Sequence, residues 1–393
     1  MEQNFFKIAV LLLAFSVGIA FASISYFNHE IYPVEVAETL IEQPVENQNS
    51  GKTLEMVFVL DTTGSMGGLL DAAKQKIWSI VNEVMQKKSR PSVRVGLVAY
   101  RDNGDAYVTQ VVPITEDLDK VYTNLKDFEA GGGGDTPENV RRALAEGVKK
   151  AGWSSSRQGV AQVLFLVGDA PPQNYAGEPD VFVTAAEAVR KNMIVNTIQC
   201  GNESDTRRIW QQIAQAGQGK YFAIAQNGGV ETINTPYDER LSELGQQFGG
   251  TYMAYGDISS RGARSEAQAY TESKVANTAT NTARADRALN KALNKDAYDS
   301  DLIQDIEKGK TRLEDVKAEN LPEPLQKMPP AERVRQVETR IAERKKIRDE
   351  ILSLSKQRDA FVAGERKKTG KGGGFDAAVQ EALSEQLARR GIE

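Results

Sequence analysis

Side chains that could do chemistry are concentrated in three short polar segments, which follow apolar runs or a run of glycines. They are Asp61, Thr63 and Ser65 in the first segment, Asp135 and Thr136 in the second, and Asp169 in the third. In the first segment an acid is followed at +2 and +4 by hydroxyls, so one carboxylate and two neutral oxygens converge if the loop curls around a point. Oxygen donors with few carboxylates suit a hard cation, and octahedral Mg²⁺ better than Ca²⁺. The three segments therefore indicate a divalent-cation site.

The composition excludes several other kinds of site. The 393 residues include one histidine, His29, and one cysteine, Cys200, which excludes an intramolecular disulfide, Cys/His zinc sites and haem attachment. A histidine-based catalytic triad would need His29, which lies beside a hydrophobic terminal segment. The net charge of −5, from 49 Lys and Arg against 54 Asp and Glu, does not suggest wholesale binding to nucleic acid. Cys200 ends an apolar run and is expected to be buried as a small hydrophobe.

The segments around these residues alternate between apolar runs rich in β-formers and amphipathic helical patterns. Strands are expected at 54–60, 93–100, 107–112, 163–167, 194–199 and 221–225, and helices at 69–84, 118–128, 137–151, 181–191, 206–216 and 238–248. This alternation predicts an α/β fold with a doubly wound, mainly parallel sheet and one antiparallel edge. In such sheets, sites lie where loops leave the carboxyl ends of the strands, and that rule selects the three polar segments.

With these loops and this order of elements, residues 53–250 resemble the von Willebrand factor A (VWA) domain family, a Rossmann-like fold. The family's metal-ion-dependent adhesion site has the form Asp-x-Ser-x-Ser on a first loop, a threonine on a second and an aspartate on a third. The resemblance maps this site onto Asp61, Thr63, Ser65, Thr136 and Asp169. It implies a protein-binding module rather than an enzyme, in which Mg²⁺ captures a Glu or Asp carboxylate of a partner protein.

Two residues depart from the family's pattern. Thr63 stands where serine is usual, but it keeps the hydroxyl, so we expect coordination to survive. Asp135 lies beside Thr136, and the sequence leaves open which of the two is the ligand from the second loop. If Asp135 reaches the metal, its negative charge reduces the pull of the metal on an incoming anion.

Other interpretations of the same residues remain. Asp61 could be the phosphoryl-accepting nucleophile of a Mg²⁺-dependent phosphatase resembling the haloacid-dehalogenase family, although the second acid of that family is replaced by Thr63. The chain could also be a structural scaffold with a vestigial metal site. Asp61 and Thr136 could simply cap helices. Asp102 and Asp105 are interpreted as residues of a hairpin turn.

The N-terminus predicts export. Residues 1–27 contain an apolar run typical of a signal peptide, with a cleavage pattern after Ala22, or of a membrane anchor if residues 8–27 are retained. Residues 28–52 form a polar linker. We therefore expect an exported protein, either periplasmic or otherwise extracytoplasmic, or anchored in a membrane.

Residues 251–393 are expected to form a helical, partly flexible extension of unknown role. A short helix is expected at 301–317, a long charged helix at 331–360 and a final helix at 375–390 after a glycine-rich linker. The apolar spacing of the long helix does not support an extended coiled coil, so it favours a helical hairpin or a partner-dependent helix. Its basic clusters are interpreted as a solvated face.

Overall fold

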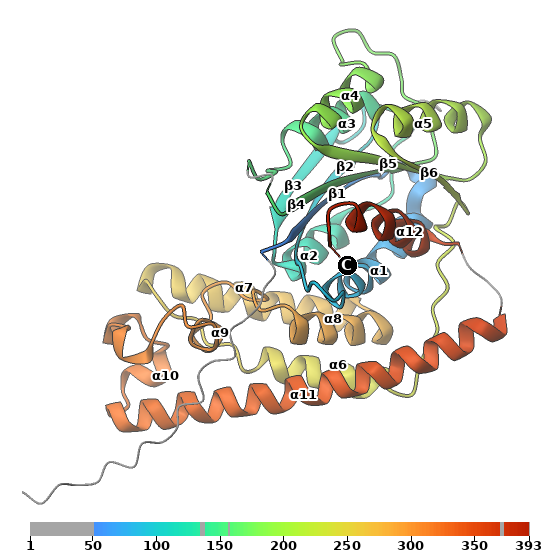
Figure 1. The fold of residues 1–393 in the computed structure, drawn as a ribbon. Coiled ribbons are helices and arrows are strands. Elements are labelled where there is room, and N and C mark those ends of the chain that lie inside the picture. Colours follow the sequence, from blue (N-terminus) through green and yellow to red (C-terminus); the bar gives the residue numbers. More distant parts are fainter. Residues whose placement is uncertain (1–50, 134–137, 156–157, 370–372, 393) are drawn as a thin grey trace, which may run out of the picture. The chain divides into compact units, whose positions relative to one another are not determined.

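A single sheet forms the centre of the described part of the chain. The computed structural model describes residues 51–133, 138–155, 158–369 and 373–392. The strand order is β3-β2-β1-β4-β5-β6 (Figure 1), and all neighbouring strands are parallel except β3, which is antiparallel to β2. The strands are β1 (Thr53–Asp61), β2 (Ser92–Tyr100), β3 (Thr109–Thr115), β4 (Val160–Gly168), β5 (Met193–Cys200) and β6 (Gln218–Ile224). The predicted mainly parallel α/β sheet with an antiparallel edge is confirmed.

Helices cover both faces of this sheet (Figure 1). In β1 the side chains of Met56 and Phe58 pack in one core and those of Val57 and Val59 in the other, because successive residues of a strand point to opposite faces. All of β1 after Thr53 is buried, as the continuous apolar run predicted. The helices that follow the strands are α1 (Gly67–Met85), α2 (Leu118–Asp127), α3 (Val140–Lys149), α4 (Val181–Arg190) and α5 (Ser204–Ala216). Cys200 is buried, as predicted.

The last helix of the chain, α12 (Phe375–Ala388), belongs to the main core. It contacts α1, β5 and β6, and the ring of Phe375 lies 5.8 Å from that of Phe58 in β1, measured between ring centroids. The buried side chains recur at three-to-four spacing, as in any amphipathic helix, at Phe375, Ala378, Val379, Ala382, Leu383 and Leu387. The sequence predicted the helix, but not that it covers the sheet.

The residues between β6 and α12 form a helical layer. Its members are α6 (Asp238–Gly249), α7 (Ile258–Thr278), α8 (Asn281–Leu293), α9 (Leu302–Glu307), α10 (Glu323–Gln326) and α11 (Pro330–Thr369). The apolar side chains of α6 pack against α8 and α11 rather than against the sheet. The long helix α11 thus packs within its own chain through Ile347 and Ile351, so the alternative of a helix that needs a partner is not required.

Buried arginines hold the helical layer together and join it to the sheet. Arg358 of α11 donates to Asp238 at 2.6 Å and to Asp286 at 2.7 Å. Arg287 of α8 donates to Asp119 of α2 at 2.7 Å, which links the helical layer to a helix that packs on the sheet. Removal of one partner from such a buried pair leaves an uncompensated buried charge, which is strongly destabilising.

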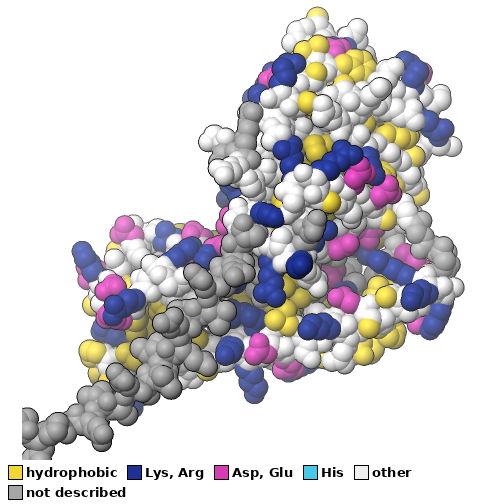
Figure 2. Space-filling view, in the orientation of Figure 1, with side chains coloured by type: hydrophobic (Ala, Val, Ile, Leu, Met, Phe, Trp, Pro, Cys, Tyr) yellow, Lys and Arg dark blue, Asp and Glu magenta, His cyan; other side chains and the backbone are white. Residues whose placement is uncertain are grey.

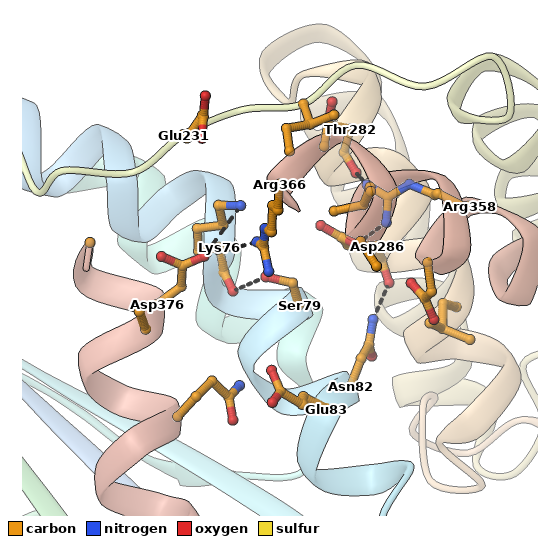
Figure 3. A pocket seen from close by; sticks show the side chains of 18 of the residues that line it. Lys76, Ser79, Asn82, Glu83, Glu231, Thr282, Asp286, Arg358, Arg366 and Asp376 are labelled. Atoms are coloured by element: carbon orange, nitrogen blue, oxygen red, sulfur yellow. Dashed lines mark hydrogen bonds and ion pairs between the residues drawn. The ribbon is translucent and has the colours of Figure 1, made fainter. Parts of the chain in front are cut away.

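A cavity of about 890 Å³ lies where α1, α8, α11 and α12 meet (Figure 3). Acidic and basic side chains line it together: Asp376 lies 3.4 Å from Lys76 and 3.7 Å from Arg366. On the face of the molecule shown in Figure 2, Lys and Arg side chains are likewise interspersed with Asp and Glu. The lining thus shows both signs of charge without a clear excess of either.

Several predictions fall outside the described residues. Residues 1–27 and most of the 28–52 linker are among them, so the signal peptide, the anchor at 8–27 and cleavage after Ala22 stay predictions. Within the described ranges, none of the helices combines the length and apolar character needed to cross a bilayer. The domain limits at 53–250 and 251–393 also stay predictions.

We predict that Phe375→Ala destabilises the protein by about 3–5 kcal/mol, because it removes a fully buried aromatic side chain from the main core. Chemical denaturation gives the free energy of unfolding. Ser384→Ala, on the exposed face of the same helix, is the matched control and should change it by less than about 0.5 kcal/mol. A loss below about 1 kcal/mol for Phe375→Ala would contradict the docking of α12 on the sheet.

Candidate functional site

The first and third polar loops lie side by side because β1 and β4 are adjacent parallel strands. Leu60 pairs with Val167, so Asp61 and Gly168 come next at the same edge of the sheet, and Asp169 begins the third loop. The carboxyl ends of β1 and β4 form the centre of the sheet edge, with β2 and β5 on either side. This is the place where open α/β sheets bind ligands.

The first loop brings its three predicted oxygens together. The backbone N–H of Thr63 donates to Asp61 Oδ1 at 2.9 Å, and the Thr63 hydroxyl donates to the same oxygen at 2.6 Å. Thr63 Oγ1 lies 3.4 Å from Ser65 Oγ. Neighbouring ligands of an octahedral Mg²⁺ with bonds of 2.0–2.1 Å are about 3 Å apart, so the two hydroxyls have nearly that spacing. Asp61 and Thr63 are buried and Ser65 is exposed, so the group opens to solvent at Ser65.

Asp61 is a fully buried acid without a countercharge. Its Oδ2 atom has no hydrogen-bond partner in the described structure. Burial raises the pKa of Asp61 to about 7; the hydrogen bonds from Thr63 and the nearby hydroxyl of Tyr100 oppose this rise, and the charge of Asp169 adds to it. Gly168 of the neighbouring strand lies close to this carboxyl group. A Cβ atom added to Gly168 would lie 3.0 Å from Asp61 Oδ2 and still closer to the hydroxyl of Tyr100, so there is no space for a side chain at this position.

Asp169 is held by a residue that the sequence did not single out. Gln226, which follows β6, donates from Nε2 to Asp169 Oδ2 at 2.6 Å and to the backbone carbonyl of Ser65 at 3.3 Å. The Thr206 hydroxyl donates to the backbone carbonyl of Asp169 at 3.1 Å. A glutamine two residues beyond a strand end carries no motif, so pattern reasoning had no signal for it.

The flanks of the second loop are tied to the other two loops, whereas Asp135 and Thr136 lie outside the described residues. The N–H of Gly131 donates to the carbonyl of Thr62 at 3.1 Å. On the other flank, the N–H of Glu138 donates to the carbonyl of Pro171 at 3.1 Å, and Gln173 donates back to Glu138 at 2.8 Å. The choice between Asp135 and Thr136 as a ligand therefore stays a prediction.

Two further buried acids lie near these loops. Glu138 Oε2 and Asp102 Oδ1 are buried without hydrogen-bond partners in the described structure. Burial and the charges of Asp61, Asp102, Asp105 and Asp169 raise the pKa of Glu138 to about 9.

The predicted turn from Asp102 to Asp105 is present. The prediction was incomplete, because Asp102 is also buried and accepts a hydrogen bond from Tyr175 at 2.5 Å. A turn motif says nothing of this burial.

The carboxyl groups at this edge of the sheet are suited to binding a cation. None of the ion pairs found among the described residues includes Asp61, Asp102, Asp105, Glu138 or Asp169. Buried carboxylates are normally paired or coordinate metals, so unpaired oxygens at a sheet edge are consistent with a cation there. In the described ranges, however, no three acidic, histidine or cysteine side chains are grouped so as to hold a metal ion alone. Coordination at this edge would depend on hydroxyl oxygens such as those of Thr63 and Ser65.

We predict that Gly168→Ala destabilises the protein by about 1–3 kcal/mol, because the added methyl group overlaps the Tyr100 hydroxyl. Combining it with Tyr100→Phe should restore part of the loss, since the nearest overlapping atom is removed. Thermal unfolding of the two single variants and the double variant measures this coupling. Strictly additive effects would show that Tyr100 does not confine this strand end.

The chain is similar in sequence to known proteins. Residues 55–236 match a family model described as the von Willebrand factor A domain. Human von Willebrand factor A domain-containing protein 7 is 39% identical over 87 residues, 22% of this chain and 9% of that protein. Human hemicentin-1 is 25% identical over 170 residues, 43% of this chain and 3% of that protein. The chain thus spans less than a tenth of the length of these relatives.

Solved structures also overlap part of this chain, and one of them serves as an example. It is that of an aerotolerance-related membrane protein from Bacteroides fragilis NCTC 9343 with multiple mutations to serines, at 15% identity and a TM-score of 0.31. The overlap covers 45% of this chain and 92% of that one. The sequence match and the observed mainly parallel sheet lead to one conclusion: residues 55–236 are a von Willebrand factor A domain.

Proposed function

We propose that this protein binds another protein through a Mg²⁺ ion at the edge of the sheet. VWA domains are generally interaction modules rather than enzymes, and many of them bind a divalent metal. The observation that carries the proposal is the unpartnered, fully buried Oδ2 of Asp61 next to the convergent oxygens of Thr63 and Ser65. The proposed ligand set is Asp61, Thr63, Ser65 and Asp169 with Asp135 or Thr136.

The chemistry of these donors favours capture of an anion. The hydroxyls of Thr63 and Ser65 bring no charge, so with Thr136 as the second-loop ligand the set carries no more than the two negative charges of Asp61 and Asp169. A divalent cation held in this way is at most neutralised, and an open coordination position on it can accept a Glu or Asp carboxylate from a partner. Ser65 is exposed, which gives a partner side chain access to this end of the ligand set.

The alternative of a phosphatase has less support. A nucleophilic carboxylate must reach a substrate phosphorus atom, but Asp61 is 0% exposed and its Oδ1 atom already accepts two hydrogen bonds from Thr63. The residue at +2 is a threonine, which cannot replace the acid that protonates a leaving group. The alternative of a vestigial site is decided by whether Mg²⁺ binds at all.

We also propose that residues 1–27 direct export or anchor the protein in a membrane, and that residues 28–52 tether the VWA domain. The support is the apolar run followed by a polar, proline-containing stretch. The site would then meet its partner outside the cytoplasm.

We predict that Asp61→Ala abolishes both Mg²⁺ binding and Mg²⁺-dependent partner capture, because it removes the buried carboxylate of the ligand set. Calorimetric titration with MgCl₂ measures the first effect. Affinity capture with Mg²⁺ or with EDTA, followed by identification of the bound proteins, measures the second. The fold should be retained, as judged by circular dichroism.

Asp71→Ala is the matched control, because Asp71 is an exposed acid on α1, just beyond the loop. It should bind Mg²⁺ and partner as the wild type does. Partner capture that is unchanged by EDTA or by Asp61→Ala would overturn the proposal. Hydrolysis of a phosphate ester that is lost in Asp61→Asn would favour the phosphatase instead.

A further inference from the structure

Gln226 occupies a position that joins two of the loops of the proposed site. Its Nε2 atom lies 2.6 Å from Asp169 Oδ2 and 3.3 Å from the carbonyl oxygen of Ser65. Both partners are acceptors, so the atom between them must be the amide nitrogen, which also lies 3.9 Å from Met66 Sδ. The side chain therefore connects the backbone of the first loop to the carboxylate of the third.

The absence of a side chain at Gly201 leaves room for the carboxamide in this orientation. The Oε1 atom of Gln226 faces Gly201, where an added Cβ would overlap it. Gly201 has a φ of +78°, a left-handed conformation that favours glycine, and its N–H donates to the carbonyl of Ile224 at 2.9 Å. A larger residue there would displace the glutamine. The glycine after β5 is thus compatible with this position of the glutamine.

The loop that carries Gln226 is itself fixed on its other side. A Cβ on Gly68 of α1 would lie 2.8 Å from Cα of Asn227, so α1 and this loop are in close contact. The carbonyl of Gly228 accepts a hydrogen bond from the N–H of Phe375 at 2.8 Å, at the start of α12. Gln226 therefore extends toward Asp169 from a rigid support, although its own side chain is exposed.

We infer that Gln226 is a positioning residue of the site, whose neutral amide donates one hydrogen bond to the Asp169 carboxylate and one to the Ser65 carbonyl and so holds the third loop against the first. The inference rests on the proposed function, because it concerns how Mg²⁺ is held. A neutral donor suits this role, because lysine or arginine would orient Asp169 equally well but would place a positive charge beside the cation. Loss of a residue that orients a metal ligand typically lowers metal affinity about 10–100-fold.

Calorimetric titration with MgCl₂ of the full chain, Gln226→Ala, Gln226→Glu and the control Gln211→Ala tests this inference. Gln211 is an exposed glutamine on α5, remote from these hydrogen bonds. We expect affinity about 10–100-fold lower for Gln226→Ala. Glutamate has the same shape but cannot donate when ionised, so Gln226→Glu should not restore binding. The melting temperature of Gln226→Ala in EDTA should fall by at most about 4 °C.

The outcomes separate this inference from the proposed function. If the wild type does not bind Mg²⁺, the proposed function fails and the inference fails with it. If the wild type binds and Gln226→Ala binds equally well, the inference alone is overturned. A larger drop in melting temperature in EDTA would indicate a general structural role and overturn it as well.

Discussion

The structure of the site depends on the burial of one carboxyl group, that of Asp61, at the end of the central strand. Transfer of an ionised carboxylate from water without a countercharge is so unfavourable that the group normally changes its pKa or finds a cation. Here the pKa rises to about 7, and one oxygen still has no partner in the described structure. The neighbouring strands enforce this arrangement, because β1 lies between β2 and β4 and cannot move its end outward.

Distant parts of the chain contribute to holding this edge. The loop after β6 contacts the third loop through Gln226 and the start of α12 through Gly228. Between these two segments the chain leaves the sheet, forms the helical layer from α6 to α11, and returns with α12 to cover the face of β1. The buried pair of Arg287 and Asp119 joins that layer to α2. The VWA sheet and the helical layer therefore share buried contacts as well as a chain connection.

Much of this architecture could be predicted from periodicity. Apolar runs such as Val163 to Val167 became buried strands, and the strand-end rule selected Asp61 and Asp169 correctly as neighbours at one edge. The spacing of Thr63 and Ser65 also predicted that their hydroxyls converge, and in the structure the two oxygens lie 3.4 Å apart. These features are local, or follow from the order of parallel strands.

The features that could not be predicted depend on contacts between residues far apart in sequence. Nothing local distinguishes α6, which packs on α8 and α11, from a helix that covers the sheet. The approach of Gln226 to Asp169 and the burial of Asp102 and Glu138 likewise arise only once the loops are assembled.

Anomalous diffraction from crystals grown with MnCl₂ tests the central claim most directly, because Mn²⁺ suits the same oxygen ligands as Mg²⁺ and can be located by its anomalous signal. We expect an anomalous peak within bonding distance of Thr63 Oγ1 and Ser65 Oγ, beside the buried carboxyl of Asp61. The absence of a peak there at saturating Mn²⁺, or a peak confined to other acidic side chains, would contradict the proposed metal site.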